Sequence, residues 1–283
     1  MSLDAVLLAL ASAFLFGAMT VAIRLALRRG AGAEPGALAT VLTAVAVTVP
    51  FALAQGGTVA GVWPFLLAGL LGPGLSQLFF TLAVREAGPS RTSVVVGTAP
   101  LFSVVIAVVL LGEPLQAGLV AGALLIVGGG ALLVSERGRP AHVRVAGLVL
   151  ALAATVVFAT RDNLVRWLAV DTDVSPGAAA TATLTAGAVV IAGYLVLTRA
   201  PTGRRSVGAF VPAGVLFGLS YVCLFEAYYR GPVTVVSPLV ATESLWGVAL
   251  SALVLARSER VGVRLVAGAC LVVAGGVLIG AFR

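Results

Sequence analysis

Charged residues are scarce in this sequence, and lysine is missing altogether. Of the 283 residues, 10% are charged and 60% are hydrophobic, and all 18 basic residues are arginines. A Walker-type phosphate loop needs its lysine, and so does a retinal Schiff base, so a conventional ATP site and a rhodopsin are both excluded. The composition is not that of a soluble enzyme, in which about 25% of residues carry a charge.

Metal-binding and redox-active residues are equally rare. The two cysteines, Cys223 and Cys270, lie inside apolar segments, where we expect them to act as small buried hydrophobic residues. The single histidine, His142, has no partner at metal-ligand spacing, and neither a Gly-x-Ser-x-Gly nor a His-Glu-x-x-His motif occurs. We therefore expect no metal, no cofactor and no enzymatic activity.

Apolar segments of about 20 residues, the length that a helix needs to cross a bilayer, account for most of the chain. Ten are expected, at 3–24, 35–54, 62–84, 91–111, 116–135, 144–168, 176–197, 207–229, 233–256 and 262–281. The net charge of +7 comes from arginines near the ends of these segments, so we expect a lipid bilayer and no nucleic acid as the partner. The sequence predicts an all-α integral membrane protein of the cell (cytoplasmic) membrane.

The second half of the chain repeats the first. The segment AGALLIVGGGALL (121–133) returns as AGACLVVAGGVLI (267–279), with eight of thirteen positions identical at an offset of 146 residues. ALASAFLFGA (9–18) likewise matches ALAATVVFAT (151–160). We therefore divide the chain into a five-helix repeat at 1–135, a linker at 136–143 and a second five-helix repeat at 144–283.

Arginine placement predicts how the repeats sit in the membrane. Fourteen arginines lie in or beside the odd-numbered connections, and three lie on the opposite side. Because basic residues collect on the cytoplasmic side, we expect both termini to be extracytoplasmic. Five spans per repeat is an odd number, so the two repeats are expected to be inverted, as in secondary transporters that bind their ligand between the halves.

Glycine and proline suggest where helices pack and where they break. Glycines recur at helical spacing in the fifth and tenth segments, where close helix contacts need small residues. We expect each of these helices to dock against its own half or against a second subunit in a homodimer. Pro73, Pro100 and Pro238 are expected to break the third, fourth and ninth segments, which then line a cavity.

Together, these features resemble the drug/metabolite transporter superfamily, in its ten-helix EamA-type branch. The resemblance is carried by FLFGA (14–18), AGPSRTSVVVGTAPLFSVVIAVVLLGEP (87–114), RGPVTVVSPL (230–239) and the glycine-rich helices. It implies two inverted five-helix repeats around a central cavity, and transport of small organic metabolites, often export. The family usually has Trp-Gly where Phe16-Gly17 stands here, and usually keeps its termini in the cytoplasm.

Four ionisable residues lie within the predicted spans, where charge is costly and often functional: Arg161, Asp162, Glu226 and Glu243. Asp162 precedes Arg166 by four residues and Glu226 precedes Arg230 by four, so each acid can be neutralised on its own helix. Alternatively, Arg161, Asp162 and Glu226 form a charged vestibule at the external surface. Arg161 does not share a helix face with Asp162, so it either reaches the interface or holds a carboxylate in the cavity.

Glu243 is the main candidate for coupling. It lies at the centre of the ninth segment, five residues after Pro238, with no arginine within helical reach. We expect the buried carboxyl group to be protonated or paired across helices. It either loads and releases a proton during transport or makes a structural hydrogen bond between helices. Trp246 lies one turn further on and is a candidate for stacking on a ligand.

Neutral polar residues complete the predicted site. Tyr221, Ser220 and Gln77, which is the repeat partner of Ser220, are expected to add hydrogen bonds to a small-molecule substrate. A cavity of mixed charge suits amino acids and other zwitterionic metabolites. We therefore expect a secondary active transporter, an exporter or exchanger with proton coupling as one option. The alternatives are a multidrug or other solute permease and a passive channel-like facilitator of the same fold.

Overall fold

Every regular element in the described part of this computed structural model is helical. The described residues are 3–56, 61–102, 105, 117–134, 144–200, 204–231, 233–255 and 262–281. The elements are α1 (Leu3–Arg28), α2 (Ala33–Ala54), α3 (Trp63–Gly69), η1 (Leu70–Leu75), α4 (Ser76–Ala87), α5 (Pro89–Val96), α7 (Ala117–Val134), α8 (Val145–Ala169), α9 (Pro176–Thr198), α10 (Arg204–Arg230), α11 (Val233–Val240), α12 (Glu243–Leu255) and α13 (Val263–Ala281). The expected all-α fold is confirmed over these residues.

Among the residues that the structure describes, seven helical segments are long and apolar enough to cross a membrane. Shorter apolar helices occur at Val120–Gly129 and Val263–Ile279, within the expected fifth and tenth spans. The expected fourth span, 91–111, lies partly outside the described residues, so the count of ten stays a prediction. Large apolar side chains cover the outside of the bundle, as lipid contact requires; Leu197 and Val263 are both 86% exposed.

Three of the spans are interrupted near prolines. In the third span, Gly72 leaves the helical conformation (φ −135°, ψ 122°) directly before Pro73. In the fourth, α5 ends at Val96, and a turn separates it from the helical residues around Pro100. In the ninth, α11 contains Pro238 and ends at Val240, and α12 begins at Glu243. These breaks leave backbone groups outside regular helical hydrogen bonding at membrane depth, where buried surroundings are required.

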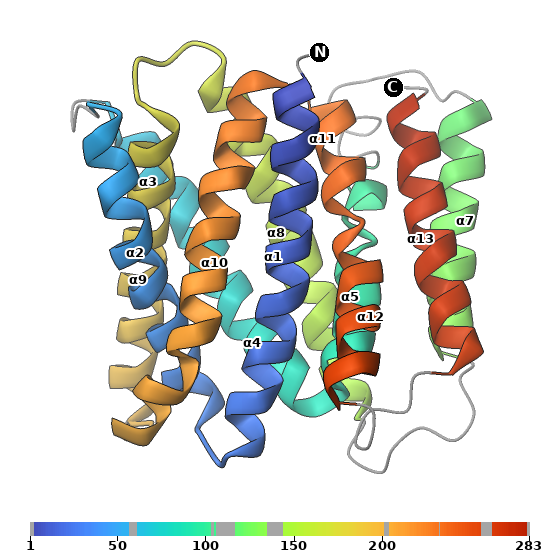
Figure 1. Cartoon of the computed structure of the whole chain (residues 1–283), viewed down its shortest axis with the longest axis horizontal. Coiled ribbons are helices and arrows are strands. Elements are labelled where there is room, and N and C mark those ends of the chain that lie inside the picture. Colours follow the sequence, from blue (N-terminus) through green and yellow to red (C-terminus); the bar gives the residue numbers. More distant parts are fainter. Residues whose placement is uncertain are drawn as a thin grey trace.

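The helices stand roughly side by side, and both termini lie at the same end of the bundle (Figure 1). We call this end the terminal face; α1 begins there at Leu3 and α10 ends there at Arg230. We call the opposite end the arginine-rich face; α1 ends there at Arg28 and α8 begins there at Val145. Helix α1 packs on α10, α10 on α2, α2 on α9, and α4 on α8.

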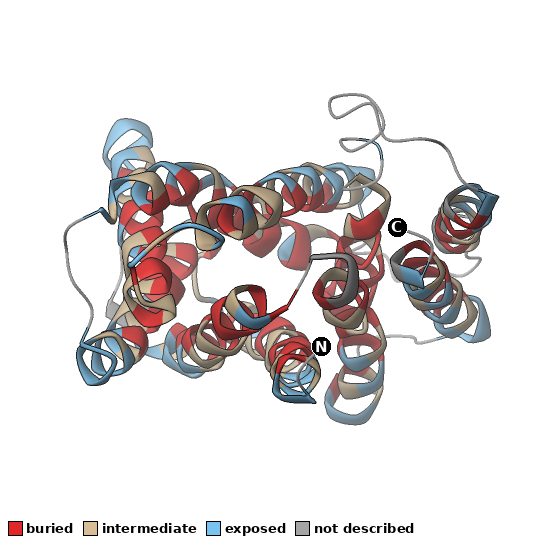
Figure 2. Cartoon of the chain, turned by 90° about the horizontal axis from the view of Figure 1, so that it is seen from above, coloured by how far each residue is buried: buried red, intermediate tan, exposed pale blue. Residues whose placement is uncertain are grey.

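The glycine-rich helices α7 and α13 form a pair at one edge of the bundle (Figures 1 and 2). A Cβ atom added at Gly122 would lie 2.7 Å from the carbonyl oxygen of Gly275, and one added at Gly129 would lie 2.6 Å from that of Gly268. We expected each helix to dock against its own half or a second subunit; in the structure the two glycine faces pack against each other, and α13 also contacts α11 and α12 of its own half. Glycine permits this backbone approach. Docking against a second subunit stays a prediction.

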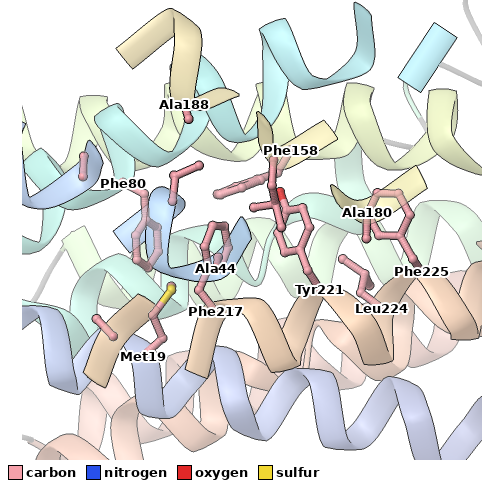
Figure 3. Packing of buried hydrophobic residues seen from close by; sticks show 14 of the residues in the cluster. Met19, Ala44, Phe80, Phe158, Ala180, Ala188, Phe217, Tyr221, Leu224 and Phe225 are labelled. Carbon is pink, nitrogen blue, oxygen red and sulfur yellow. The ribbon is translucent and has the colours of Figure 1, made fainter. Parts of the chain in front are cut away.

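Aromatic rings fill the middle of the bundle (Figure 3). Phe16 of α1 packs edge-on against Phe80, Phe158 and Phe217, with ring centroids 5.1, 5.8 and 6.2 Å away. Phe217 in turn contacts Tyr221, one turn along α10, at 4.5 Å. Edge-to-face pairs of this kind add about 0.5–1.5 kcal/mol each beyond their burial. The rings therefore fix α1, α4, α8 and α10 beside the cavity described next.

Candidate functional site

A cavity lies between mid-depth and the terminal face, with about 500 Å³ of empty space including its opening. Its walls come from the long helices α1, α8 and α10 and from the interrupted fourth and ninth spans. The lining residues are Ser12, Phe16, Val96, Ala99, Phe158, Arg161, Asp162, Ser220, Tyr221, Leu224, Ser237, Val240, Ala241 and Glu243. Three ionisable groups, Arg161, Asp162 and Glu243, thus share one small space inside the bundle.

The two helix breaks at the cavity are built in the same way. After α5, the hydroxyl of Thr98 donates to the carbonyl oxygen of Val95 at 2.6 Å. After α11, the hydroxyl of Thr242 donates to the carbonyl oxygen of Leu239, also at 2.6 Å. Each threonine therefore satisfies a carbonyl near the end of a helix inside the protein. The residue that follows Thr242 is Glu243, which is thereby placed at the cavity wall.

Glu243 is buried, with 5% of its surface exposed, and it opens α12. No side chain described in the structure hydrogen-bonds to its carboxyl group. Burial favours the uncharged acid, whereas the partial positive charge at the start of a helix favours the carboxylate. The position therefore suits a group that changes its protonation state.

Arg161 and Asp162 form an ion pair, with 2.9 Å between Arg161 Nε and Asp162 Oδ1. Our expectation that Arg161 turns away from Asp162 was wrong, and pairing of Asp162 with Arg166, one of the two interpretations of their spacing, is not what the structure contains. Arg166 instead donates from Nη1 to the carbonyl oxygen of Tyr228 at 2.6 Å. Adjacent Cβ atoms do point apart on a helix, but the long arginine stem can bend back and bring Nε to the neighbouring carboxylate.

The guanidinium of Arg161 lies between two aromatic rings. Its central carbon is 5.5 Å from the ring centroid of Phe158 and 4.9 Å from that of Tyr221, distances at which rings attract cations. The contact with Asp162 lacks hydrogen-bond geometry, so Nε and Nη1 of Arg161 and Oδ1 of Asp162 have no hydrogen-bond partner among the described residues. The hydroxyls of Tyr221 and Tyr228 are also unpartnered there. Buried polar atoms of this kind are able to bind a polar ligand.

Ser220 also lines the cavity, but its hydroxyl already has partners on α1. It donates to the carbonyl oxygen of Ser12 at 3.0 Å, and its Oγ lies 3.0 Å from the Oγ of Ser12. The two serines therefore join α1 to α10 at the cavity wall.

Three residues that the sequence suggested for the site do not line this cavity. Gln77 is fully buried on α4, and neither its amide nitrogen nor its amide oxygen has a hydrogen-bond partner in the described part of the chain. Trp246 is 41% exposed and meets the ring of Phe14 edge-on at 5.1 Å. Glu226 is not among the residues that line the cavity with Arg161 and Asp162.

Glu226 is bound in a separate cluster at the terminal face. It pairs with Arg230 on its own helix, with 2.7 Å between Oε2 and Nη2, and accepts a hydrogen bond from the Gln55 side chain. Gln55 also accepts a hydrogen bond from the backbone N–H of Gly177 at 2.8 Å. Local neutralisation, one of the two interpretations of the Glu226–Arg230 spacing, is what the structure contains.

Sequence reasoning missed two aromatic residues of the site, Phe16 and Phe158, although a signal was present. They are equivalent positions of the two repeats, since ALASAFLFGA and ALAATVVFAT align them. In the structure both line the cavity, and their rings contact each other. Contact between equivalent residues is what an axis of pseudo-symmetry between the repeats would produce.

Comparisons with known proteins agree with this arrangement. The model of the EamA-like transporter family matches residues 3–135 and, a second time, residues 145–281. A solved crystal structure shares the fold with a TM-score of 0.69 at 23% sequence identity, and the alignment covers 98% of this chain and 96% of that one. No curated protein matches the chain.

Proposed function

Because the chain belongs to the EamA-like transporter family, we propose that it is a proton-coupled secondary active transporter of small organic solutes such as amino acids. The observation that carries this proposal is the placement of Glu243 in one buried cavity with the Arg161–Asp162 pair. A titratable acid beside fixed charges is the arrangement that lets a proton and a solute influence each other's binding. The family match supports a transporter of small solutes, and the cavity supplies the finer assignment.

We further propose that the two halves are inverted repeats that alternate around the cavity. Gly122 and Gly268 are equivalent positions, as are Gly129 and Gly275. Gly122 packs on Gly275 while Gly129 packs on Gly268, so the contact is exchanged between the repeats. An exchanged contact is the signature of a two-fold relation. With an odd number of spans in each half, that axis lies in the membrane plane.

The charge balance of the cavity favours zwitterionic solutes carried together with a proton. The lining residues that the structure describes contain one guanidinium and two carboxyl groups. With Glu243 protonated, Arg161 and Asp162 cancel, and a zwitterion leaves the occupied cavity neutral. A neutral interior minimises the cost of closing the site away from water, because buried net charge is expensive.

The proposal is tested in sealed proteoliposomes with an imposed pH gradient and radiolabelled amino acids. We expect uptake of at least one amino acid to follow the proton gradient, and Glu243→Gln to abolish this dependence while exchange between solute pools persists. The matched control is Glu226→Gln, since that acid is paired with Arg230 outside the cavity and is expected to retain coupling. Flux that ignores both the gradient and Glu243→Gln would rule out coupling at this residue.

A second candidate is a permease that exchanges organic cations, including drugs, for protons. It is favoured by the excess of carboxyl groups over guanidinium groups and by the aromatic lining. With Glu243 ionised, an organic cation in the cavity also brings the total charge of the site to zero. The cation and the proton on Glu243 would therefore replace each other and move in opposite directions. Opposite directions of proton and solute flux would select this function, and flux without countertransport stimulation would identify a passive facilitator.

We also propose that the arginine-rich face is cytoplasmic and the terminal face external. The support is the distribution of arginines along the sequence. An impermeant maleimide applied to intact cells is expected to label a cysteine placed at Asp173 and to spare one placed at Arg29. The reverse pattern would place the termini in the cytoplasm.

A further inference from the structure

The break in the third span lies against Arg161. A Cβ atom added at Gly72 would lie 3.4 Å from both Cβ and Cγ of Arg161 and 3.0 Å from the hydroxyl of Ser76. The extended residue Gly72 therefore packs beside the stem of an arginine from the neighbouring helix α8. Arg161 is consequently 2% exposed and lines the cavity without reaching either surface.

The orientation of the guanidinium is fixed from several sides. Phe158 and Tyr221 contribute the two aromatic rings, and Asp162 lies beside Nε. Nη1 remains buried with no hydrogen-bond partner among the described residues. A guanidinium held in this way loses little freedom when it binds, and its planar fork matches the two oxygens of a carboxylate.

The local charges indicate what the rest of the ligand contains. A carboxylate bound at Arg161 adds a negative charge beside Asp162, in a cavity that Glu243 also lines. An ammonium group on the same ligand would face those acids and offset the added charge. A simple organic anion has no positive group to offset its charge beside the two acids. A simple amine has no carboxylate to accept hydrogen bonds from the guanidinium of Arg161.

We propose that Arg161 binds the carboxylate of the transported solute and that the solute is an amino acid or a similar compound with an adjacent ammonium group. This inference rests on the proposed transport function and names the ligand group that the site recognises. Phe158 and Tyr221 act as positioning residues for the guanidinium. Asp162 and Glu243 provide the negative side of the binding site.

The test is a binding experiment on the purified full chain in detergent, with no transport step. The twenty common amino acids are first screened for a rise in Tm. The one that gives the largest rise is compared with its carboxamide, which lacks the carboxylate, and with its deaminated acid, which lacks the ammonium. We expect both analogues to bind about tenfold or more weakly, because each leaves a charged hydrogen-bonding group unpartnered.

Variants then assign the carboxylate to Arg161. In Arg161→Gln the preference for the amino acid over its carboxamide is expected to disappear, and Arg161→Lys is expected to recover only part of it, since a lysine has no fork. Arg161→Gln leaves Asp162 unpaired, so the charge-neutral double variant Arg161→Gln/Asp162→Asn is measured as well. Arg230→Gln is the control, because that arginine pairs with Glu226 away from the cavity.

Three outcomes would overturn the inference. They are a screen in which no amino acid raises Tm, equal binding of the amino acid and its carboxamide, and a preference that survives in the double variant. A carboxylate-dependent Tm shift without gradient-driven flux in proteoliposomes would support the binding assignment and contradict the proposed transport function. Gradient-driven flux that Arg161→Gln leaves unchanged would support the proposed transport function and contradict the assignment of the carboxylate to Arg161.

Discussion

Arg144 of the second half is bound twice to Glu86 of the first. Its Nη1 lies 3.2 Å from Glu86 Oε2, and its backbone N–H donates to the Glu86 carbonyl oxygen at 2.8 Å. Glu86 also lies 2.8 Å from Nε of Arg85, whose Nη1 is 3.0 Å from Glu34. The two contacts between Arg144 and Glu86 tie the halves together at the arginine-rich face, whereas the cavity is lined from mid-depth toward the terminal face.

Weakening this tie is expected to favour a state that opens at the arginine-rich face. The Arg144 side chain is 74% exposed, so solvent limits the ion pair to about 1 kcal/mol or less. We therefore expect Glu86→Gln to change the population of such a state by roughly two- to fivefold. The measurement is maleimide labelling, from that face, of Ala99→Cys in a background without Cys223 and Cys270.

Glu226→Gln serves as the control for this experiment, because its ion pair lies at the terminal face. Labelling from the arginine-rich face is expected to stay unchanged in that variant. Equal labelling in Glu86→Gln and the unmodified protein would mean that the packed helices alone keep this face closed.

The close contact between α7 and α13 is expected to tolerate no side chain at its centre. A Cβ atom at Gly275 would lie 2.5 Å from the carbonyl oxygen of Gly122, and backbone cannot rotate away. Gly275→Ala should therefore lower the free energy of unfolding by about 1–3 kcal/mol. Gly128→Ala is the matched control, since no atom of the described residues lies within 4 Å of its added Cβ, and it should be neutral or stabilising by about 1 kcal/mol. Thermal unfolding in detergent compares the two variants. Equal Tm values would contradict the close contact between α7 and α13 at Gly275.

Trp246 is expected to contribute to stability and not to ligand binding. Its ring meets Phe14 edge-on at the outside of the bundle, so Trp246→Leu should cost about 1 kcal/mol of folding free energy. Ligand affinity should change less than about twofold, whereas Tyr221→Leu, which alters the cavity wall, should lower it about tenfold. Each variant is titrated with the ligand, and the rise in Tm at each ligand concentration gives the affinity. A large affinity loss in Trp246→Leu would place the indole on the ligand, as the sequence suggested.

Gln77 provides a test of whether a buried amide serves structure or transport. Both of its amide atoms lack hydrogen-bond partners in the described residues, so Gln77→Leu should leave the free energy of unfolding unchanged or raise it. Thr81→Val is the control. It removes the 2.8 Å hydrogen bond from the Thr81 hydroxyl to the backbone carbonyl oxygen of Gln77 and should lower the free energy of unfolding by about 1 kcal/mol. Loss of flux in Gln77→Leu with intact stability would assign the amide to the path of the solute.

The sequence alone predicted the all-helical character of the described residues and named several residues that line one cavity in the structure. Hydrophobic length indicates the spans, and costly charges within them drew attention to Arg161, Asp162 and Glu243, which share one cavity in the structure. These inferences succeed because lipid penalises unpaired polar groups wherever they occur. The repeat aligned Phe16 with Phe158, which also meet there, although their apolar character gave no reason to single them out.

Contacts between helices were much harder to predict. Self-similarity showed that α7 and α13 are equivalent, but equivalence does not say whether two elements touch. Helical spacing suggested that Asp162 pairs with Arg166, yet Arg161 is the partner. Spacing rules describe Cβ directions on an isolated helix. Here the arginine stem also contacts Gly72 of another span, and a rule based on one helix cannot include that neighbour.

The pairing of α7 with α13 has a consequence for biogenesis. A ribosome completes α7 before it begins the second half, whereas α13 is the last helix described in the chain. During that interval the glycine groove of α7 faces lipid or a temporary partner in the insertion machinery. The newly made first half therefore cannot adopt its final helix contacts until the last span has entered the bilayer.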